Sequence, residues 1–160
     1  MAWDAFPGVG LITQFDGSPL AGKNCAAAGA AMHLVSERQG RRPAKGSPWY
    51  PTGASFRAAT GDTVGGLLAS QVDATANRVY GIDIDYRIAA ASEVAARLRA
   101  GYPVSFLHRF APIRDAGFRG SGSFGENHYT FLSGIRADNA VRDLDPMFNG
   151  RRSDVPRGPQ

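Results

Sequence analysis

Residues 24–38 read NCAAAGAAMHLVSER and form the clearest helical pattern in the chain. Asn24 belongs to the residue types that favour an N-cap, and strong helix formers follow it. We therefore predict a helix from Cys25 to Arg38. Its apolar positions at helical spacing are Ala28, Met32 and Val35, and the small residues between them allow close packing. A buried central helix is expected.

Downstream of this helix, the sequence predicts further helices. Residues 40–61 hold three prolines and no sustained period, which favours a long surface loop. A helix is expected to begin at Asp62 or Thr63. Its apolar stripe would consist of Val64, Leu67, Leu68 and Val72. Ser92 is expected to cap another helix that stops at Gly101.

Four segments have the alternation or the composition of strands: residues 79–86, 102–110, 128–135 and 140–144. A turn at residues 137–139 separates the last two. Because helices come first and an antiparallel meander follows them, the predicted fold class is α+β.

The chain has 160 residues, of which 43% are hydrophobic and 20% charged. These values predict one globular domain, placed at residues 1–150, and a basic tail rich in Pro and Arg at residues 151–160. No run approaches the roughly 18 apolar residues of a membrane helix. The first residues lack a basic stretch followed by an apolar one. We therefore expect no secretion signal and a protein that is cytoplasmic when made.

The formal net charge of +4 is concentrated at residues 38–45 and 151–157. Such clusters favour anionic partners, including nucleic acid, acidic cell-wall polymers and acidic protein surfaces. Because both clusters are short, we interpret them as a solvated face and an extended or docked tail. Nucleic acid is therefore not expected as a partner, whereas the tail is a candidate contact for neighbouring proteins in a larger assembly.

Cys25 is the only cysteine, which excludes an internal disulfide and leaves either a buried packing residue or a free thiol. A cysteine in the first turn of a helix lies among unpaired N–H groups, near the positive end of the helix dipole. Both stabilise a thiolate and lower the pKa of the thiol. The pattern therefore predicts a nucleophile at Cys25.

A thiolate nucleophile needs a base, and the chain offers three histidines. His33 lies roughly 12 Å further along the same predicted helix, too far to pair with Cys25. His108 lies on a predicted strand among apolar neighbours, a pattern typical of core packing. His128 begins a strand after a loop rich in Gly and Ser, where a side chain can reach a cleft. We predict that His128 is the base.

A third group must orient this base, and the last predicted strand and the residues after it offer three candidates, Asp143, Asp145 and Asn149. Asp145 precedes Pro146, which ends the strand and would hold the carboxylate at the edge of the sheet. Gln14 is a candidate oxyanion donor, together with the backbone N–H of Cys25.

Four motifs in this order resemble the papain-like cysteine peptidases of the bacteriocin-leader-processing (double-glycine peptidase-like) type. They are Gln14-Phe15 with residues 24–32, then residues 98–104 (LRAGYPV), residues 127–135 (NHYTFLSGI) and residues 141–146 (VRDLDP). The resemblance covers roughly residues 11–150.

The resemblance implies a papain-like fold, in which the helix that carries the nucleophile Cys25 packs on a C-terminal antiparallel sheet that carries His128. It also implies that Asp145 orients the base and that Gln14 is the oxyanion donor. Members of this family usually have Gly directly after the cysteine, where this chain has Ala26.

The expected activity is hydrolysis of a peptide or amide bond through a Cys25 thioester. The basic charge and the expected absence of a secretion signal favour a peptidoglycan cross-bridge as the substrate, in a phage or bacterial lytic setting. The alternative hypothesis is an inactive or secondary papain-like domain that serves as a structural or binding component of a larger assembly, such as a phage virion.

Two other kinds of site are not expected. Residues 120–125 (GSGSFG) match the dinucleotide-binding fingerprint, but they follow no clear strand and lead into a β-type segment rather than a helix. The scattered histidines and the single cysteine give no zinc-ligand spacing. We therefore expect neither a cofactor nor a metal.

Overall fold

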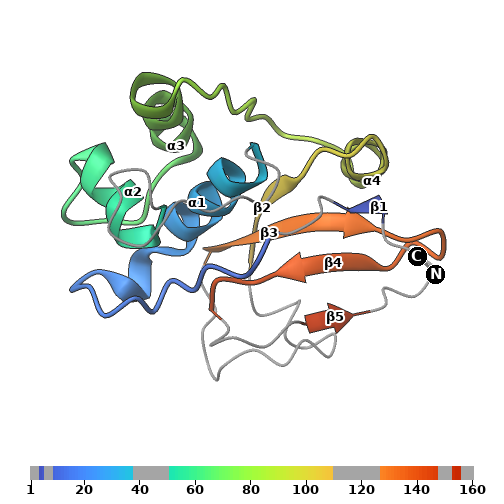
Figure 1. The fold of residues 1–160 in the computed structure, drawn as a ribbon, viewed down its shortest axis with the longest axis horizontal. Helices are drawn as coiled ribbons and strands as arrows, with labels where there is room; N and C mark the ends of the chain where they lie inside the picture. The colour runs from blue at the N-terminus through green and yellow to red at the C-terminus, as the bar shows by residue number, and fades with distance from the viewer. Residues whose placement is uncertain (1–3, 6–8, 38–50, 110–126, 148–152, 156–160) are drawn as a thin grey trace.

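The computed structural model describes residues 4–5, 9–37, 51–109, 127–147 and 153–155. Its helical elements are η1 (Ala21–Lys23, a 3-10 turn), α1 (Cys25–Glu37), α2 (Gly53–Thr60), α3 (Ala69–Thr75), η2 (Ala76–Tyr80, a π-helical turn) and α4 (Ala91–Arg99). Its strands are β1 (Asp4–Ala5), β2 (Val104–Arg109), β3 (Asn127–Ile135), β4 (Val141–Leu144) and β5 (Ser153–Val155). The fold class is α+β, as predicted (Figure 1).

The strand β3 is the centre of the sheet, and every pairing in the sheet is antiparallel. Its first part pairs with β2, its last two residues pair with β1, and β4 lies along its other edge. The strand β5 then pairs with β4. The sheet therefore takes a strand from each end of the chain, which the sequence did not predict.

Part of the predicted tail thus belongs to the sheet, because β5 lies within residues 151–160. The other residues of that tail lie outside the described part of the chain. So do the basic cluster at residues 38–45 and the fingerprint-like segment at residues 120–125. Among the described residues, no helix is long and apolar enough to cross a membrane.

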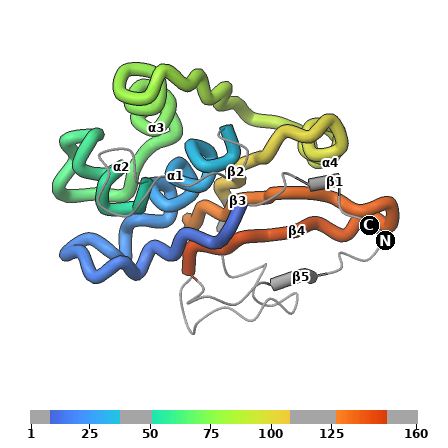
Figure 2. Tube along the Cα trace, in the orientation of Figure 1, coloured from blue at the N-terminus to red at the C-terminus, as the bar shows by residue number. Residues whose placement is uncertain are grey.

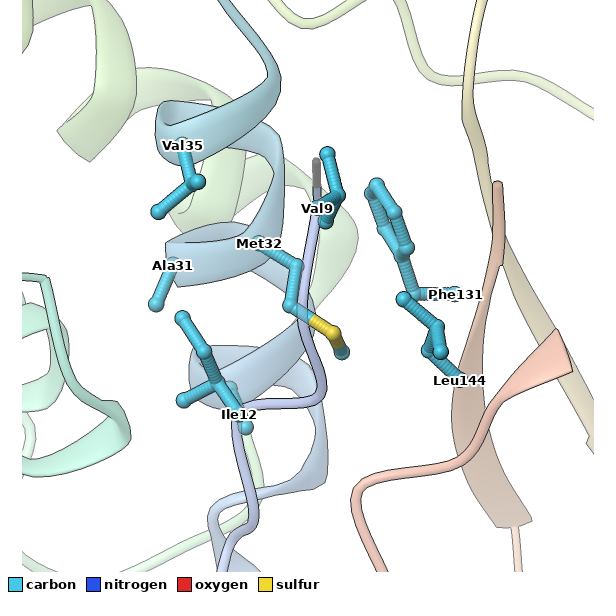
Figure 3. Packing of buried hydrophobic residues seen from close by; sticks show 8 residues of the cluster. Val9, Ile12, Ala31, Met32, Val35, Phe131 and Leu144 are labelled. Carbon is cyan, nitrogen blue, oxygen red and sulfur yellow. The ribbon is translucent and has the colours of Figure 1, made fainter. Parts of the chain in front are cut away.

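The helix α1 is the buried central helix that the sequence predicts. In Figure 2 its trace lies between α2 on one side and β3 and β4 on the other. Its predicted apolar face packs in one cluster with the segment before it and with the sheet (Figure 3). That cluster consists of Val9, Ile12, Ala28, Ala31, Met32, Val35, Phe131 and Leu144. The helix that carries Cys25 is therefore held against the sheet by apolar burial.

Successive residues of β3 contribute to two different clusters. Phe131 packs with α1, whereas Leu132 packs with Leu98 of α4. This alternation follows from the strand geometry, in which neighbouring side chains point to opposite faces. Both faces of β3 are therefore covered, which fixes the position of the strand that carries His128.

The expectation of a loop throughout residues 40–61 is wrong for the part that the structure describes, because α2 lies there. Thr52 and Ser55 form a reciprocal capping box at its start, with N–H donors 3.0 Å and 2.8 Å from the two side-chain oxygens. Gly61 ends the helix with a φ of 73°. The capping box and the C-terminal glycine therefore stabilise a short helix directly after Pro51, the last of the three prolines in this segment.

The prediction of a helix that begins at Asp62 or Thr63 is also wrong. The carboxylate of Asp62 accepts the N–H groups of Val64 and Gly65 at 2.9 Å and 3.0 Å, which turns the chain in a loop. Val64 and Leu68 are exposed, and α3 begins only at Ala69. Asp62 therefore forms a turn instead of capping a helix, which explains why the predicted helix is absent here.

The strand predicted at residues 79–86 is absent from the described sheet, because η2 continues to Tyr80. The alternation itself is real: Ile82 and Ile84 pack against the cluster around Phe56. The prediction that Ser92 caps the next helix is also wrong, because Ala90 occupies the N-cap of α4.

Candidate active site

Cys25 is the first residue of α1, where its thiol is partly exposed. The carbonyl oxygen of Asn24 accepts the N–H of Ala28 at 2.8 Å, so Asn24 occupies the N-cap as predicted. Its side chain does not serve as the cap, because the amide donates to the Ser18 hydroxyl at 3.2 Å and accepts from Arg57. Cys25 thus lies among the N–H groups that an α-helix leaves without an intrahelical partner.

His128 is the second residue of β3, and Asp145 directly follows β4. The Nε2 atom of His128 lies 2.6 Å from Oδ1 of Asp145, and both side chains are 1% exposed. The same carboxylate oxygen accepts the N–H of Met147 at 2.8 Å. A carboxylate held by two donors in this way fixes the ring of His128.

The imidazole of His128 also forms a hydrogen bond with the thiol of Cys25. Because Nε2 is occupied by Asp145, Nδ1 is the ring nitrogen that faces the sulfur. The structure therefore brings three of the four predicted site residues into one hydrogen-bonded chain that runs from Cys25 through His128 to Asp145.

Burial alone would raise the pKa of the Cys25 thiol. The hydrogen bond and the positive charge of His128, together with the backbone N–H groups of Tyr129 and Ala26, outweigh burial, so the pKa is lowered. For His128 burial would lower the pKa, whereas Asp145 and Cys25 raise it to about 9. These shifts favour a thiolate beside an imidazolium.

Tyr129, which the sequence analysis did not select, lies beside Cys25. Its N–H group donates to the sulfur of Cys25. Burial raises the pKa of its phenol, and the charge of Cys25 raises it further. Its half-buried ring packs on the cluster of Phe56 and α1. The strand β3 therefore supplies both the imidazole that bonds to Cys25 and a backbone donor to its sulfur.

Gln14 lies on the segment before α1, and its side chain is buried. Its backbone N–H donates to the carbonyl of Pro146 at 2.8 Å, which places it next to Asp145 in space. Its Nε2 donates to the carbonyl of Ala21 at 3.2 Å. Among the described residues, its Oε1 has no hydrogen-bond partner. Gln14 is thus tied to the same strand end as Asp145.

The other two histidines occupy different positions in the fold. The ring of His33 is edge-on to Phe131, with 4.8 Å between centroids, and burial lowers its pKa to about 4. His108 pairs with His128 in the register of β2 and β3. Of the alternative orienters, Asp143 is buried within β4, and Asn149 lies outside the described residues.

Arg57 of α2 is a second residue that the sequence analysis missed. Its guanidinium is buried, and it bonds to the side chain of Asn24 and to the carbonyl of Lys23. No local pattern indicates this, because α2 and the start of α1 are far apart in sequence. The capping box that begins α2 was the available signal for the helix itself.

In the part of the chain that the structure describes, no group of three or more His, Cys, Asp or Glu side chains is placed to hold a metal ion. Comparison of the chain with family models, curated proteins and solved structures gave no significant match.

Proposed function

We propose that this chain is a papain-like cysteine peptidase or amidase that cleaves a peptide bond through a thioester on Cys25. One observation carries the proposal: hydrogen bonds link Cys25 to His128 and His128 to Asp145. A thiolate at a helix start, a base within hydrogen-bond reach and a buried carboxylate that orients this base are the parts that nucleophilic catalysis by cysteine requires.

In the proposed reaction the Cys25 thiolate attacks the carbonyl carbon, and the oxyanion accepts hydrogen bonds from the backbone N–H of Cys25 and the amide of Gln14. His128 then gives its Nδ1 proton to the leaving nitrogen, and the C–N bond breaks to leave a thioester. Water attacks this thioester while His128 takes its proton. The C–S bond breaks, and a carboxylic acid product and the thiolate are released.

For the substrate we propose a peptidoglycan cross-bridge, in a phage or bacterial lytic setting. The support is the positive net charge of +4, which favours an acidic polymer such as the cell wall over a basic one. A protein with this task would act at the cell wall after lysis or as part of a virion.

A second candidate function is that of a structural or binding component in which the site no longer cleaves. The residue after Cys25 favours it, because the buried Ala26 stands where the family that the chain resembles usually has Gly. A side chain at this position takes up space beside the thiol that a Gly would leave open. Such a domain would bind a peptide without turning it over.

The two candidates are separated by incubating the protein with purified cell wall and with cross-bridge peptides, comparing wild type with Cys25→Ala and His128→Ala. The peptidase proposal expects new amino termini with wild type alone. Binding of the same peptides by all three proteins, with no new termini, would support the second candidate instead. Equal results for all three proteins without binding would remove both.

A further inference from the structure

The start of α1 is clamped by a buried guanidinium that comes from another helix. Arg57 is 5% exposed and donates through Nη2 to the carbonyl of Lys23 at 2.8 Å. Its Nε donates to the Oδ1 of Asn24. Both partners precede Cys25 directly in the chain, so this one side chain fixes the backbone from which the nucleophile projects.

The other end of the guanidinium is fixed as well. Its Nη1 lies 3.5 Å from Oδ1 of Asp62 and donates to the Asp62 carbonyl at 3.4 Å. That carboxylate accepts two backbone N–H groups and the amide of Gln71. A planar guanidinium group that is bonded at both ends in this way has little freedom to rotate.

The helix α2 also approaches α1 closely at the same place. A Cβ added to Gly53, one turn before Arg57, would lie 3.3 Å from a carboxylate oxygen of Asp16 and 3.6 Å from the Cβ of Asn24. Asp16 in turn accepts the N–H of Ala54 at 2.7 Å. The clamp is therefore part of a tight contact between two helix starts.

We propose that Arg57 is a positioning residue for Cys25, which acts through Asn24 and Lys23 to hold the thiolate in register with His128. This inference rests on the proposed function, because it assigns Arg57 a part in forming the ion pair of that site. Without the Arg57 guanidinium, Lys23 and Asn24 are no longer fixed, and Cys25 after them can shift. The hydrogen bond between Cys25 and His128 would then weaken, because hydrogen bonds weaken steeply with misalignment.

The test is the rate of iodoacetamide alkylation of Cys25 against pH, in wild type, Arg57→Lys, Arg57→Gln and Asn24→Ala. Arg78→Lys is the matched control, because Arg78 also donates to a carbonyl, that of Ala59 at 2.8 Å, but is exposed. We expect both Arg57 variants to raise the apparent pKa of the thiol by about one unit, which lowers the alkylation rate about tenfold at pH values below the wild-type pKa. Arg57→Lys keeps the positive charge, so a purely electrostatic effect would leave the thiol pKa of this variant at the wild-type value.

A double variant of Arg57→Lys with Asn24→Ala separates positioning from general stability. If Arg57 acts through Asn24, the shift in the double variant is smaller than the sum of the two single shifts. Strictly additive shifts, or folded Arg57 variants with the wild-type profile, would overturn the inference. If Arg57→Gln does not fold, Arg57→Lys and Asn24→Ala decide the question. An ordinary thiol pKa in wild type would instead remove the proposed function itself.

Discussion

The Nε2 atom of His128 lies 2.6 Å from Oδ1 of Asp145, inside a contact where both side chains are 1% exposed. His128 lies on β3, where it pairs with His108 of β2, and Asp145 directly follows β4, whose last residue Leu144 pairs with Phe131. A buried carboxylate at this distance keeps the proton on Nε2 and directs Nδ1 to Cys25.

Loss of this carboxylate should weaken the ion pair of the site. In Asp145→Asn the carboxylate charge that helps to raise the pKa of His128 is gone, so we expect the apparent pKa of the Cys25 thiol to rise by about one unit or more, which lowers alkylation about tenfold at pH values below the wild-type pKa. Asp145→Ala should also cost about 1–3 kcal/mol in the free energy of unfolding, because it removes the carboxylate that bonds to Nε2 of the buried His128. Asp85→Asn is the control, since Asp85 is exposed. Wild-type alkylation in Asp145→Asn would contradict the assigned role.

Stability should depend on pH through His33. Its pKa is lowered in the folded protein from 6.5 to about 4, so the unfolded chain binds a proton more readily between these values. Stability is therefore present above pH 6.5 and is lost as the pH falls toward 4. We expect a loss of about 2 kcal/mol between pH 7.5 and pH 5.

The measurement is urea unfolding of wild type and His33→Leu at the two pH values. The substitution keeps an apolar contact with Phe131 but removes the titrating group. The difference in the free energy of unfolding between pH 7.5 and pH 5 should be smaller in His33→Leu than in wild type by about 2 kcal/mol. An unchanged difference would mean that His33 is solvated in the folded protein.

The packing of α1 on the sheet should depend on Met32, which is fully buried in the cluster with Phe131 and Leu144. Met32→Ala should lower the free energy of unfolding by about 2–5 kcal/mol, because it removes apolar contacts and leaves a cavity. Leu68→Ala is the control at an exposed site, where the change should stay within about 0.5 kcal/mol. Equal thermal unfolding of the two variants would show that α1 is not packed as described.

Local patterns predicted the central helix and the main strands well. Residues 25–37 combine strong helix formers with one apolar face, and that face is buried as expected. The alternation at Ile82 and Ile84 was also real, but alternating burial does not require a strand partner. The helix α2 was missed because the capping residues Thr52 and Ser55 follow a stretch rich in proline.

The candidate site was predictable only in part. Cys25 and His128 could be selected from residue type and place, and Asp145 from the proline that follows it. Arg57 could not be selected, because its partner Asn24 is distant in sequence and neither residue has a local pattern that indicates the contact. Long-range side-chain contacts of this kind depend on how α1 and α2 pack, which no single segment specifies.

The central claim is that Cys25 exists as a thiolate paired with His128. The most direct measurement is the apparent pKa of the Cys25 thiol, from alkylation rates between pH 4 and 10 in wild type and His128→Ala. We expect a wild-type value well below the roughly 8.5 of a free cysteine, and a value near or above 8.5 in His128→Ala. A wild-type thiol that titrates like a free cysteine, or that does not react at all, would contradict the account.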